Sequence, residues 1–486
     1  MNPASAAPAP LIRPLIRPLI RPLIGPLTSL LIGLSITLSP APALAAPGDA
    51  ADAKAILMRG VGFDTVLGRG KVPAYAAYLK SVLVAGGFAA GDIAIEPVGE
   101  TANLHLTWQG KAKGQSKAAP IALAGHMDVV EADPKDWVRD PFVATQDGGF
   151  IFGRGISDNK FDVSMIVATL VALKSQGFQP GRDIHLFLSG DEETAGVTAE
   201  LQARQAKAAG VAFLLNSDGG GGELDAAGKA VDYTLSAAEK TYADYQLTVT
   251  NPGGHSSRPT MPNALGQLAA ATVKIDAYRF TPQINEITRE SLADTGRKTS
   301  GKVGAALLAF VANPADAVAI ATLRAEPALI GQIGTTCVPT QVSGGHAPNA
   351  LPQKAVLTVN CRIFPGTSVE SVRAELERVV ADPAVAVKTG QEWVSTPASP
   401  LRPDVVSAVA KAVAAAHPGI RPVPGMDAGA SDSVYYRALG IPSYGVSGLF
   451  MRSEDVFIHG LDERIPVAAI PPALVHWRTL ITELAK

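Results

Sequence analysis

Acidic and histidine side chains recur along the chain in five short segments whose composition suits metal binding. The segments are GHMDVV at 125–130, GRGISDNK at 153–160, GDEET at 190–194, NSDGG at 216–220 and IHGLDER at 458–464. Imidazole nitrogens and carboxylate oxygens are common zinc ligands in catalytic sites. Each of these groups lies where an expected strand ends or a turn begins. The pattern therefore predicts five metal ligands, which are His126, Asp158, Glu193, Asp218 and His459.

Two adjacent carboxylates in the third segment have different expected roles. Glu192 and Glu193 closely follow an apolar run at 186–188. Adjacent side chains point in different directions, so one can bind a metal while the other takes a proton from water. Burial and neighbouring groups can bring the pKa of such a base close to neutrality. Glu192 is therefore the candidate general base, and the alternative is a solvated acidic turn.

The surroundings of two expected ligands also suggest how they are positioned. A metal-binding histidine commonly needs its other ring N–H held by an acceptor, and Asp128 could orient His126 in this way. Gly153 and Gly155 allow a sharp turn at a strand-to-helix junction, and the two oxygens of Asp158 could bridge two metals roughly 3.5–4 Å apart. The alternatives are a strand end without metal and an ordinary helix N-cap at Asp158.

Three further polar residues are candidates for substrate contacts. His255 lies in PGGHSS at 252–257 and could stabilise an oxyanion, provided that a second domain or a partner subunit brings it to the metals. Arg362 could pair bidentately with a substrate carboxylate. Asn349 is a weaker candidate. The alternatives are that His255 belongs to an ordinary polar loop, that Arg362 is an arginine on an edge strand, and that Asn349 only begins a common turn.

The elements that must position these residues follow an α/β pattern. Strands are expected at 93–98, 104–108, 121–124, 184–188 and 213–215, an amphipathic helix at 163–173 and a further helix at 198–208. Strands that alternate with helices favour a layered α/β domain with a mostly parallel sheet. Ligands usually bind at the carboxyl ends of such strands. His126, Glu192, Glu193 and Asp218 should therefore cluster at one edge of the sheet.

A different pattern begins near residue 243. Expected strands at 244–250, 336–342, 355–364 and 384–388, with helices at 264–274 and 369–380, predict a small α+β open sandwich. A helix at 404–416 then resumes the first pattern. We therefore expect a signal segment at 1–45, a zinc-binding catalytic domain at 46–242 and 393–486, and an inserted lid or dimerisation domain at 243–392. No function is assigned to residues 278–333.

Composition excludes several classes of protein. The chain has 486 residues, of which 47% are hydrophobic and 18% charged, as expected for a folded protein rather than a disordered one. The formal net charge is −2. Because no strong basic excess is available to neutralise phosphates, no nucleic-acid partner is expected.

The first 45 residues predict export. A repeat of Leu-Ile-Arg-Pro supplies positive charge, an apolar stretch covers 27–38, and small residues follow at 43–45. The apolar stretch is short for a membrane span, so we expect a periplasmic or secreted protein with no stable span after processing. The alternatives are an uncleaved anchor and a misassigned start codon. In an exported protein Cys337 and Cys361 could form a disulfide, although two buried thiols fit the sequence equally well.

Together the five segments resemble the dizinc metallopeptidase family of glutamate carboxypeptidase, aminoacylase, carnosinase-type dipeptidases, acetylornithine deacetylase and succinyl-diaminopimelate desuccinylase. The resemblance covers nearly everything after the signal segment. It implies that His126 and Asp218 bind one zinc ion, that Glu193 and His459 bind the other, and that Asp158 bridges them. It further implies Glu192 as base and Asp128 as the residue that orients His126. His255 would contact the scissile carbonyl oxygen and Arg362 the substrate carboxylate.

Some details indicate a branch of this family. Asp218 is similar to the dipeptidase and carboxypeptidase branches, whereas the deacetylase and desuccinylase branch tends to have Glu there. The stretches DPKDW at 133–137 and DPF at 140–142 are similar to carboxypeptidase S and the secreted N-acyl-amino-acid hydrolases. Asn159 departs from that branch, which often has Asp there. The stretch from Gly429 to Asp432 resembles a substrate-contacting loop in which the family often has a second Gly or a Thr, so the contacts of Gly429 are less well defined.

The sequence therefore predicts an exported dizinc exopeptidase of carboxypeptidase or dipeptidase type, acting on the amide bond next to a free C-terminal carboxylate. Glu192 would act as general base on a water between the zinc ions. One alternative is an N-acyl-amino-acid amidohydrolase of aminoacylase type, and another is a non-catalytic metal- or peptide-binding protein of the cell envelope. Cobalt or manganese could replace zinc. The expected partners are a peptide or N-acyl amino acid and, from the family alone, a second copy bound through the inserted domain.

Overall fold

The computed structural model describes residues 47–111, 118–391 and 393–486. The predicted signal segment at 1–45 lies outside these residues. Among the helices of the described part, none is both long enough and apolar enough to cross a membrane.

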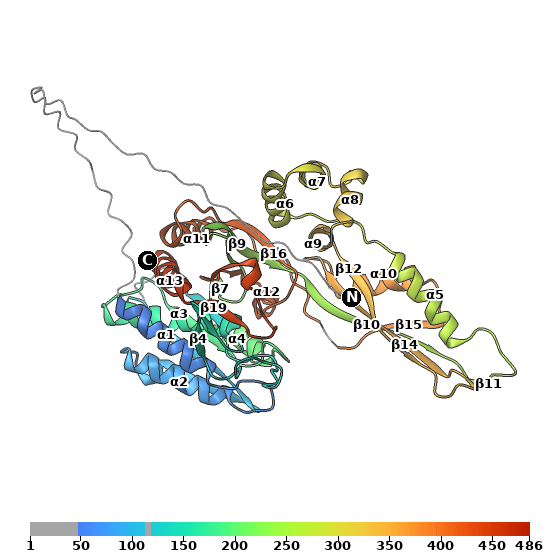
Figure 1. The fold of residues 1–486 in the computed structure, drawn as a ribbon, viewed down its shortest axis with the longest axis horizontal. Coiled ribbons are helices and arrows are strands. Elements are labelled where there is room, and N and C mark those ends of the chain that lie inside the picture. Colours follow the sequence, from blue (N-terminus) through green and yellow to red (C-terminus); the bar gives the residue numbers. More distant parts are fainter. Residues whose placement is uncertain (1–46, 112–117, 392) are drawn as a thin grey trace, which may run out of the picture. The chain divides into compact units, whose positions relative to one another are not determined.

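A large mixed sheet lies among α1 (Pro47–Val61), α3 (Phe161–Ser175), α4 (Val197–Ala208), α11 (Pro403–Ala416), α12 (Ser433–Ala438) and α13 (Ile470–Leu484) (Figure 1). Its strand order is β1 (Ile93–Val98), β2 (Thr101–Trp108), β6 (Ile184–Ser189), β3 (Ile121–His126), β7 (Leu214–Asn216), β17 (Ser443–Gly445), β9 (Ala230–Glu239), β8 (Gly221–Leu224) and β18 (Phe450–Arg452), with β16 (Val423–Asp427) also beside β9. Strand β3 runs parallel to both β6 and β7, and β17 runs parallel to β7, whereas β1 and β2 are antiparallel. The predicted α/β class is confirmed.

Helices cover both faces of this sheet because its central strands are apolar on both sides. The main core lies under α1, α2 (Val72–Ala85), α3, α11 and α13, and a smaller core lies under α4 and α12. The prediction that α3 is amphipathic is wrong. Twelve of its 15 residues are buried, because α1, α2 and α13 pack around it.

A second, four-stranded antiparallel sheet has the order β12 (Thr336–Gly344), β14 (Lys354–Ile363), β10 (Thr241–Thr250) and β15 (Val385–Thr389). Helices α5 (Ala264–Ala277) and α10 (Val369–Val380) bury the odd-numbered residues of β10, such as Tyr245 and Leu247. The even-numbered residues Tyr242 and Asp244 lie on the other face. A single residue, Lys240, separates β9 of the large sheet from β10. The predicted domain boundaries stay a prediction.

Residues 278–333, which the sequence left unassigned, form a small helical unit. It contains α6 (Glu286–Lys298), α7 (Gly301–Ala312), α8 (Ala317–Arg324), α9 (Pro327–Ile330) and the short helix η3 (Gly331–Ile333), and it has its own hydrophobic cluster. Asn285 and Asp316 cap α6 and α8, so the starts of these two helices carry a signal that sequence reasoning missed.

The two cysteines form a disulfide in the structure. Cys337 and Cys361 lie directly opposite each other on β12 and β14, where strand pairing brings their side chains to the same face. The alternative of two free thiols is therefore wrong.

Asp158 lies in a tight turn between β5 (Phe150–Phe152) and α3. The turn contains the short helical segment η2 (Ile156–Lys160), within which Asp158 has non-helical backbone angles. Lys160, not Asp158, occupies the N-cap position of α3, so the N-cap alternative for Asp158 is wrong. Gly155 has a positive φ of 72° and its Cα faces the side chain of Val129 so closely that a Cβ would collide with it. Glycine is therefore required for this turn.

The carboxylate of Glu463 holds this turn in place. It accepts hydrogen bonds from the backbone N–H groups of Gly155 at 2.9 Å, Ser157 at 2.9 Å and Asp158 at 3.2 Å, and it forms an ion pair with Arg154 at 2.9 Å. Glu463 is fully buried and lies just before β19 (Arg464–Pro466), which pairs with β5. The segment that carries His459 is thus tied to the segment that carries Asp158.

Replacing Glu463 should destabilise the protein strongly. The change Glu463→Ala leaves the buried Arg154 guanidinium and three backbone donors without their acceptor, which costs about 3–5 kcal/mol of unfolding free energy. Urea unfolding measures the loss, and Glu463→Gln, which keeps an acceptor oxygen, should lose less. An unchanged unfolding midpoint in Glu463→Ala would contradict this role.

Candidate metal centre

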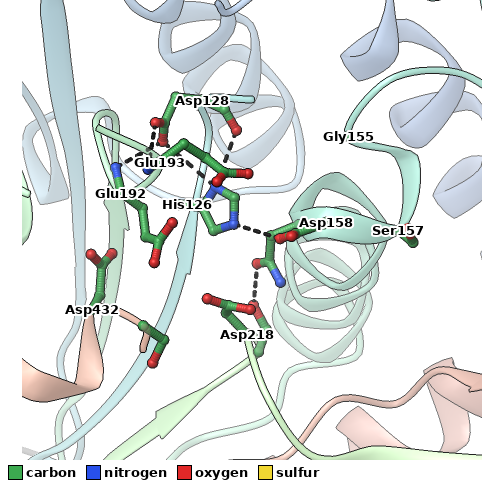
Figure 2. Close-up of polar contacts among 12 residues, drawn as sticks. His126, Asp128, Gly155, Ser157, Asp158, Glu192, Glu193, Asp218 and Asp432 are labelled. Carbon is green, nitrogen blue, oxygen red and sulfur yellow. Dashed lines mark hydrogen bonds and ion pairs between the residues drawn. The ribbon is translucent and has the colours of Figure 1, made fainter. Parts of the chain in front are cut away.

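The structure brings the five predicted ligands and Glu192 together at one edge of the large sheet. Figure 2 shows His126, Asp158, Glu192, Glu193 and Asp218, and His459 lies against Asp158 and Glu193. His126 ends β3, Glu192 and Glu193 follow β6, and Asp218 follows β7. The turn before α3 supplies Asp158, and the loop between β18 and β19 supplies His459. The carboxyl ends of β3, β6 and β7 meet at this edge because these strands are parallel.

The carboxylate of Asp158 lies between two imidazoles. Its Oδ1 atom is 2.8 Å from Nε2 of His126, and its Oδ2 atom is 3.4 Å from Nε2 of His459. The same Nε2 atom of His459 lies 3.0 Å from Oε1 of Glu193. Asp158 thus presents one oxygen toward each histidine, as a carboxylate that bridges two metal ions must do.

Two overlapping groups of side chains have the spacing of a metal site. One contains His126, Glu192 and Asp218, and the other contains His126, Asp158 and Glu193; the potential ligand atoms of each group lie within 4.8 Å of one another. Both groups combine imidazole nitrogen with carboxylate oxygen, a donor set that suits a divalent cation such as zinc. Glu192 belongs to the first group, so spacing alone does not separate a base from a ligand.

Electrostatics favours a cation at this position. Burial raises the pKa of Glu192 and of Asp218 well above their ordinary values, and neighbouring carboxylates raise both pKa values further. Several buried acids are costly to ionise together without positive charge nearby. The residues present therefore fit one or more divalent metal ions.

Asp128 does more than the sequence predicted. His126 Nδ1 is 3.1 Å from the backbone oxygen of Asp128 and 3.5 Å from its Oδ1 atom. The carboxylate also accepts the backbone N–H groups of Glu192 at 3.1 Å and Glu193 at 3.0 Å. One buried side chain thus fixes both the imidazole and the turn that carries the two glutamates.

Sequence reasoning missed a buried acid beside Glu192. Figure 2 shows Asp432 close to Glu192, and the Ser189 hydroxyl donates a hydrogen bond to its carboxylate. Burial raises the pKa of Asp432 to about 7. Ser431 holds the loop before Asp432, because its hydroxyl donates a hydrogen bond to the Glu239 carboxylate. Glu239 also forms an ion pair with Arg437 at 2.6 Å. The stretch 429–432 resembles a substrate-contacting loop, but nothing in the sequence singles out Asp432.

Two of the four predicted substrate-binding residues lie near this loop. Arg362, near the end of β14, donates a hydrogen bond to the backbone oxygen of Ala428 at 3.3 Å, and its guanidinium lies 4.7 Å from the ring centre of Tyr242. Gly429 follows Ala428, is exposed, and has open space where a Cβ would stand.

The other two predicted substrate-binding residues, His255 and Asn349, lie away from this loop. His255 is exposed on β11 (Gly254–His255). Asn349 is exposed just before β13 (Ala350–Leu351), the strand that pairs with β11. The backbone N–H of Ser256 donates a hydrogen bond to the backbone oxygen of Asn349 at 3.0 Å. Within the described residues, no hydrogen bond or ion pair joins His255 or Asn349 to the metal centre.

Two cavities flank the metal centre. One, of about 490 Å³, includes Asp158 and Asp218 in its lining. The other, of about 500 Å³, includes Glu192 and Asp432. A substrate whose scissile bond lies at the metal centre thus has room for a group on each side.

Comparison with known proteins agrees with this arrangement. An N-fatty-acyl-amino acid synthase/hydrolase of Xenopus tropicalis is 28% identical over 364 residues, which are 72% of this chain and 70% of that protein. A probable carboxypeptidase S-like protein of Dictyostelium discoideum is 27% identical over 75% of this chain and 72% of its own length. The crystal structure of an M20 family metallo-carboxypeptidase from Sulfolobus solfataricus shares the fold, with 17% identity, a TM-score of 0.66 and coverage of 89% of this chain and 98% of that one.

The family model described as peptidase family M20/M25/M40 matches residues 122–483, which include every predicted metal ligand. This chain therefore belongs to peptidase family M20/M25/M40 and is a hydrolase of metallopeptidase type.

Proposed function

We propose that this protein is a dinuclear metal hydrolase that cleaves the amide bond next to a free C-terminal carboxylate. The observation that carries the proposal is the Asp158 carboxylate, which presents one oxygen to His126 and the other to His459. A single metal ion would need only one of these contacts. The proposal therefore calls for two metal ions, one on each side of Asp158.

The ligands divide between the two ions according to which side of Asp158 they occupy. His126 and Asp218 would hold one ion, and Glu193 and His459 the other. Zinc suits this mixture of nitrogen and oxygen donors, with cobalt or manganese as substitutes. When bound, two such ions polarise a carbonyl group and make water a stronger nucleophile near neutral pH.

Glu192 would move the proton in this reaction. Its side chain is half-buried beside the metal centre, and desolvation raises its pKa, which suits a group that must take and return a proton. It would accept a proton from the attacking water as the new C–O bond forms, and donate it to the amine nitrogen as the C–N bond breaks. Asp128 fixes the turn that carries Glu192, and Arg362 would hold the substrate carboxylate.

Two neighbouring substitutions separate the base from a ligand. Glu192→Gln should keep two metal ions per chain and lose turnover by about 100- to 10,000-fold, because it removes proton transfer alone. Glu193→Gln should lower metal content as well as turnover, because it removes a ligand. Metal analysis and kcat on the purified variants measure both effects. Full turnover in Glu192→Gln would exclude it as the base.

A second candidate, an N-acyl-amino-acid amidohydrolase, is favoured by the cavity beside Asp158 and Asp218. One part of its lining is apolar and comprises Leu449, Met451, Val456 and Ile458. Val456 and Ile458 are each 50% exposed although they are large and apolar. An apolar acyl group would cover them, and the Xenopus relative bears the name of an N-fatty-acyl-amino acid hydrolase.

A substrate panel separates the two candidates. Hydrophobic dipeptides and N-acyl amino acids are assayed in parallel with zinc restored, each beside its C-terminally amidated form. Loss of the carboxylate should lower kcat/KM by about 10- to 100-fold, because Arg362 loses a charged partner. A preference for long N-acyl chains would support the amidohydrolase. Equal turnover of free and amidated substrates would contradict both candidates.

The exposed position of His255 suggests that it acts in the site of a second copy. It lies on β11 beside Asn349, away from the hydrogen-bond network of its own metal centre. We propose that a homodimer formed through the four-stranded sheet and its helices brings His255, with Asn349 beside it, to the partner's substrate. There His255 would stabilise the developing oxyanion.

Complementation tests this arrangement. Glu192→Gln and His255→Ala should each have low turnover alone. In mixed dimers one site regains an intact Glu192 from one chain and an intact His255 from the other, so activity should rise toward a quarter of the wild-type level after subunit exchange. If the His255 of each chain serves the site of that same chain, mixing the two variants should not raise the activity.

Export also stays a prediction. The disulfide between Cys337 and Cys361 is in keeping with an oxidising compartment. The N-terminal sequence of the protein recovered outside the cytoplasm would test the expected cleavage near residue 45.

A further inference from the structure

The cavity on the Glu192 side of the metal centre has an aromatic wall. Glu192 and Asp432 lie at one part of its lining, and Tyr242 and Trp393 at another. Its volume of about 500 Å³ is within the range of small-molecule pockets, about 300–1,000 Å³. Neither aromatic residue belongs to the predicted metal or substrate set.

The two aromatic side chains pack against each other and against Arg362. The ring centres of Tyr242 and Trp393 are 4.9 Å apart with a tilt of 53°. The Arg362 guanidinium lies 4.7 Å from the Tyr242 ring centre, because Tyr242 and Arg362 are directly opposite each other on β10 and β14. Such contacts between aromatic rings and a guanidinium hold all three side chains in place.

This arrangement matches the three substituents on the α-carbon of an amino acid. In the proposed reaction the released residue has its amine nitrogen at Glu192 and its carboxylate at Arg362. Its side chain must then point into space that Glu192 borders and that lies beside Tyr242, the ring against which Arg362 packs. The cavity lined by Glu192, Tyr242 and Trp393 is such a space.

Away from Glu192 and Asp432, the charged residues of the cavity offer little attraction to a charged side chain. Glu200 and Arg204, which also line it, form an ion pair with each other at 2.5 Å. Their charges are already compensated, so they give little attraction to a further charge. The aromatic rings offer apolar surface to an apolar side chain.

We propose that this cavity receives the side chain of the released amino acid, and that Tyr242 and Trp393 select large apolar or aromatic side chains there. This inference rests on the proposed function, because it takes the released product to be an amino acid with a free carboxylate. Trp393 contacts the side chain directly. Tyr242 contacts it and also positions Arg362 for the carboxylate.

Selectivity for the released residue tests the inference. The ratio of kcat/KM for N-acetyl-L-phenylalanine to that for N-acetyl-L-alanine should exceed one in the zinc-loaded wild type. Trp393→Ala should lower this ratio about tenfold, and Trp393→Phe should keep most of it, because a ring remains. Tyr278→Ala removes an aromatic side chain that lies outside this cavity and should leave the ratio unchanged.

Binding gives a readout that does not depend on turnover. Calorimetry on the zinc-loaded protein should show tighter binding of free L-phenylalanine than of L-alanine, and Trp393→Ala should remove the difference. If Trp393→Ala keeps both the wild-type kinetic ratio and the wild-type difference in binding, the inference is overturned while the proposed function stands. If the wild type hydrolyses no amide beside a free carboxylate, the proposed function fails, and the binding comparison alone decides whether the cavity takes an apolar amino acid.

Discussion

Repulsion among carboxylates at one edge of the large sheet is the constraint on which the rest of the structure depends. Glu192 and Asp218 share one group of possible ligand atoms with His126, and Asp158 and Glu193 share another. Burial and neighbouring carboxylates raise the pKa of Glu192 and of Asp218, so their negative charge is costly. A fold that holds these carboxylates together must fix each one through contacts on the side away from the metal site. It must also leave their free oxygens directed at a common point, where a cation offsets the repulsion.

The structure meets this constraint by compensating only the supporting acids. Glu463 is paired with Arg154 and backbone donors, Asp128 is held by two backbone N–H groups, and Glu239 is paired with Arg437. In the described part of the chain, no Arg or Lys pairs with the acids at the centre, and only the imidazoles of His126 and His459 lie against Asp158 and Glu193. The outer carboxylates therefore act as rigid supports, and the inner ones keep the affinity for a metal that pairing with Arg or Lys would remove.

The sequence could indicate the inner acids but not their supports. His126 and Asp218 stand at strand ends, so strand prediction alone placed them at one edge of the sheet. Glu463 owes its role to contacts with residues about 300 positions away, and no local pattern reports such a contact. Helix α3 was misjudged for a related reason, since its surroundings come from three distant helices. The helices within 278–333 were missed although Asn285 and Asp316 supply ordinary caps.

Substrate selection depends on a different part of the chain from the chemistry. Lys240 alone separates β9 of the large sheet from β10 of the small one, and Tyr242 stands two residues beyond it. Trp393 follows β15, where the chain leaves the small sheet. Both aromatic residues thus lie at the crossings between the sheets. The metal ligands instead lie at the strand ends of the large sheet and on the segments that follow β5 and precede β19. A change in the angle between the sheets would reshape the cavity and shift Arg362 without moving a ligand, so selectivity can vary while the metal centre stays the same.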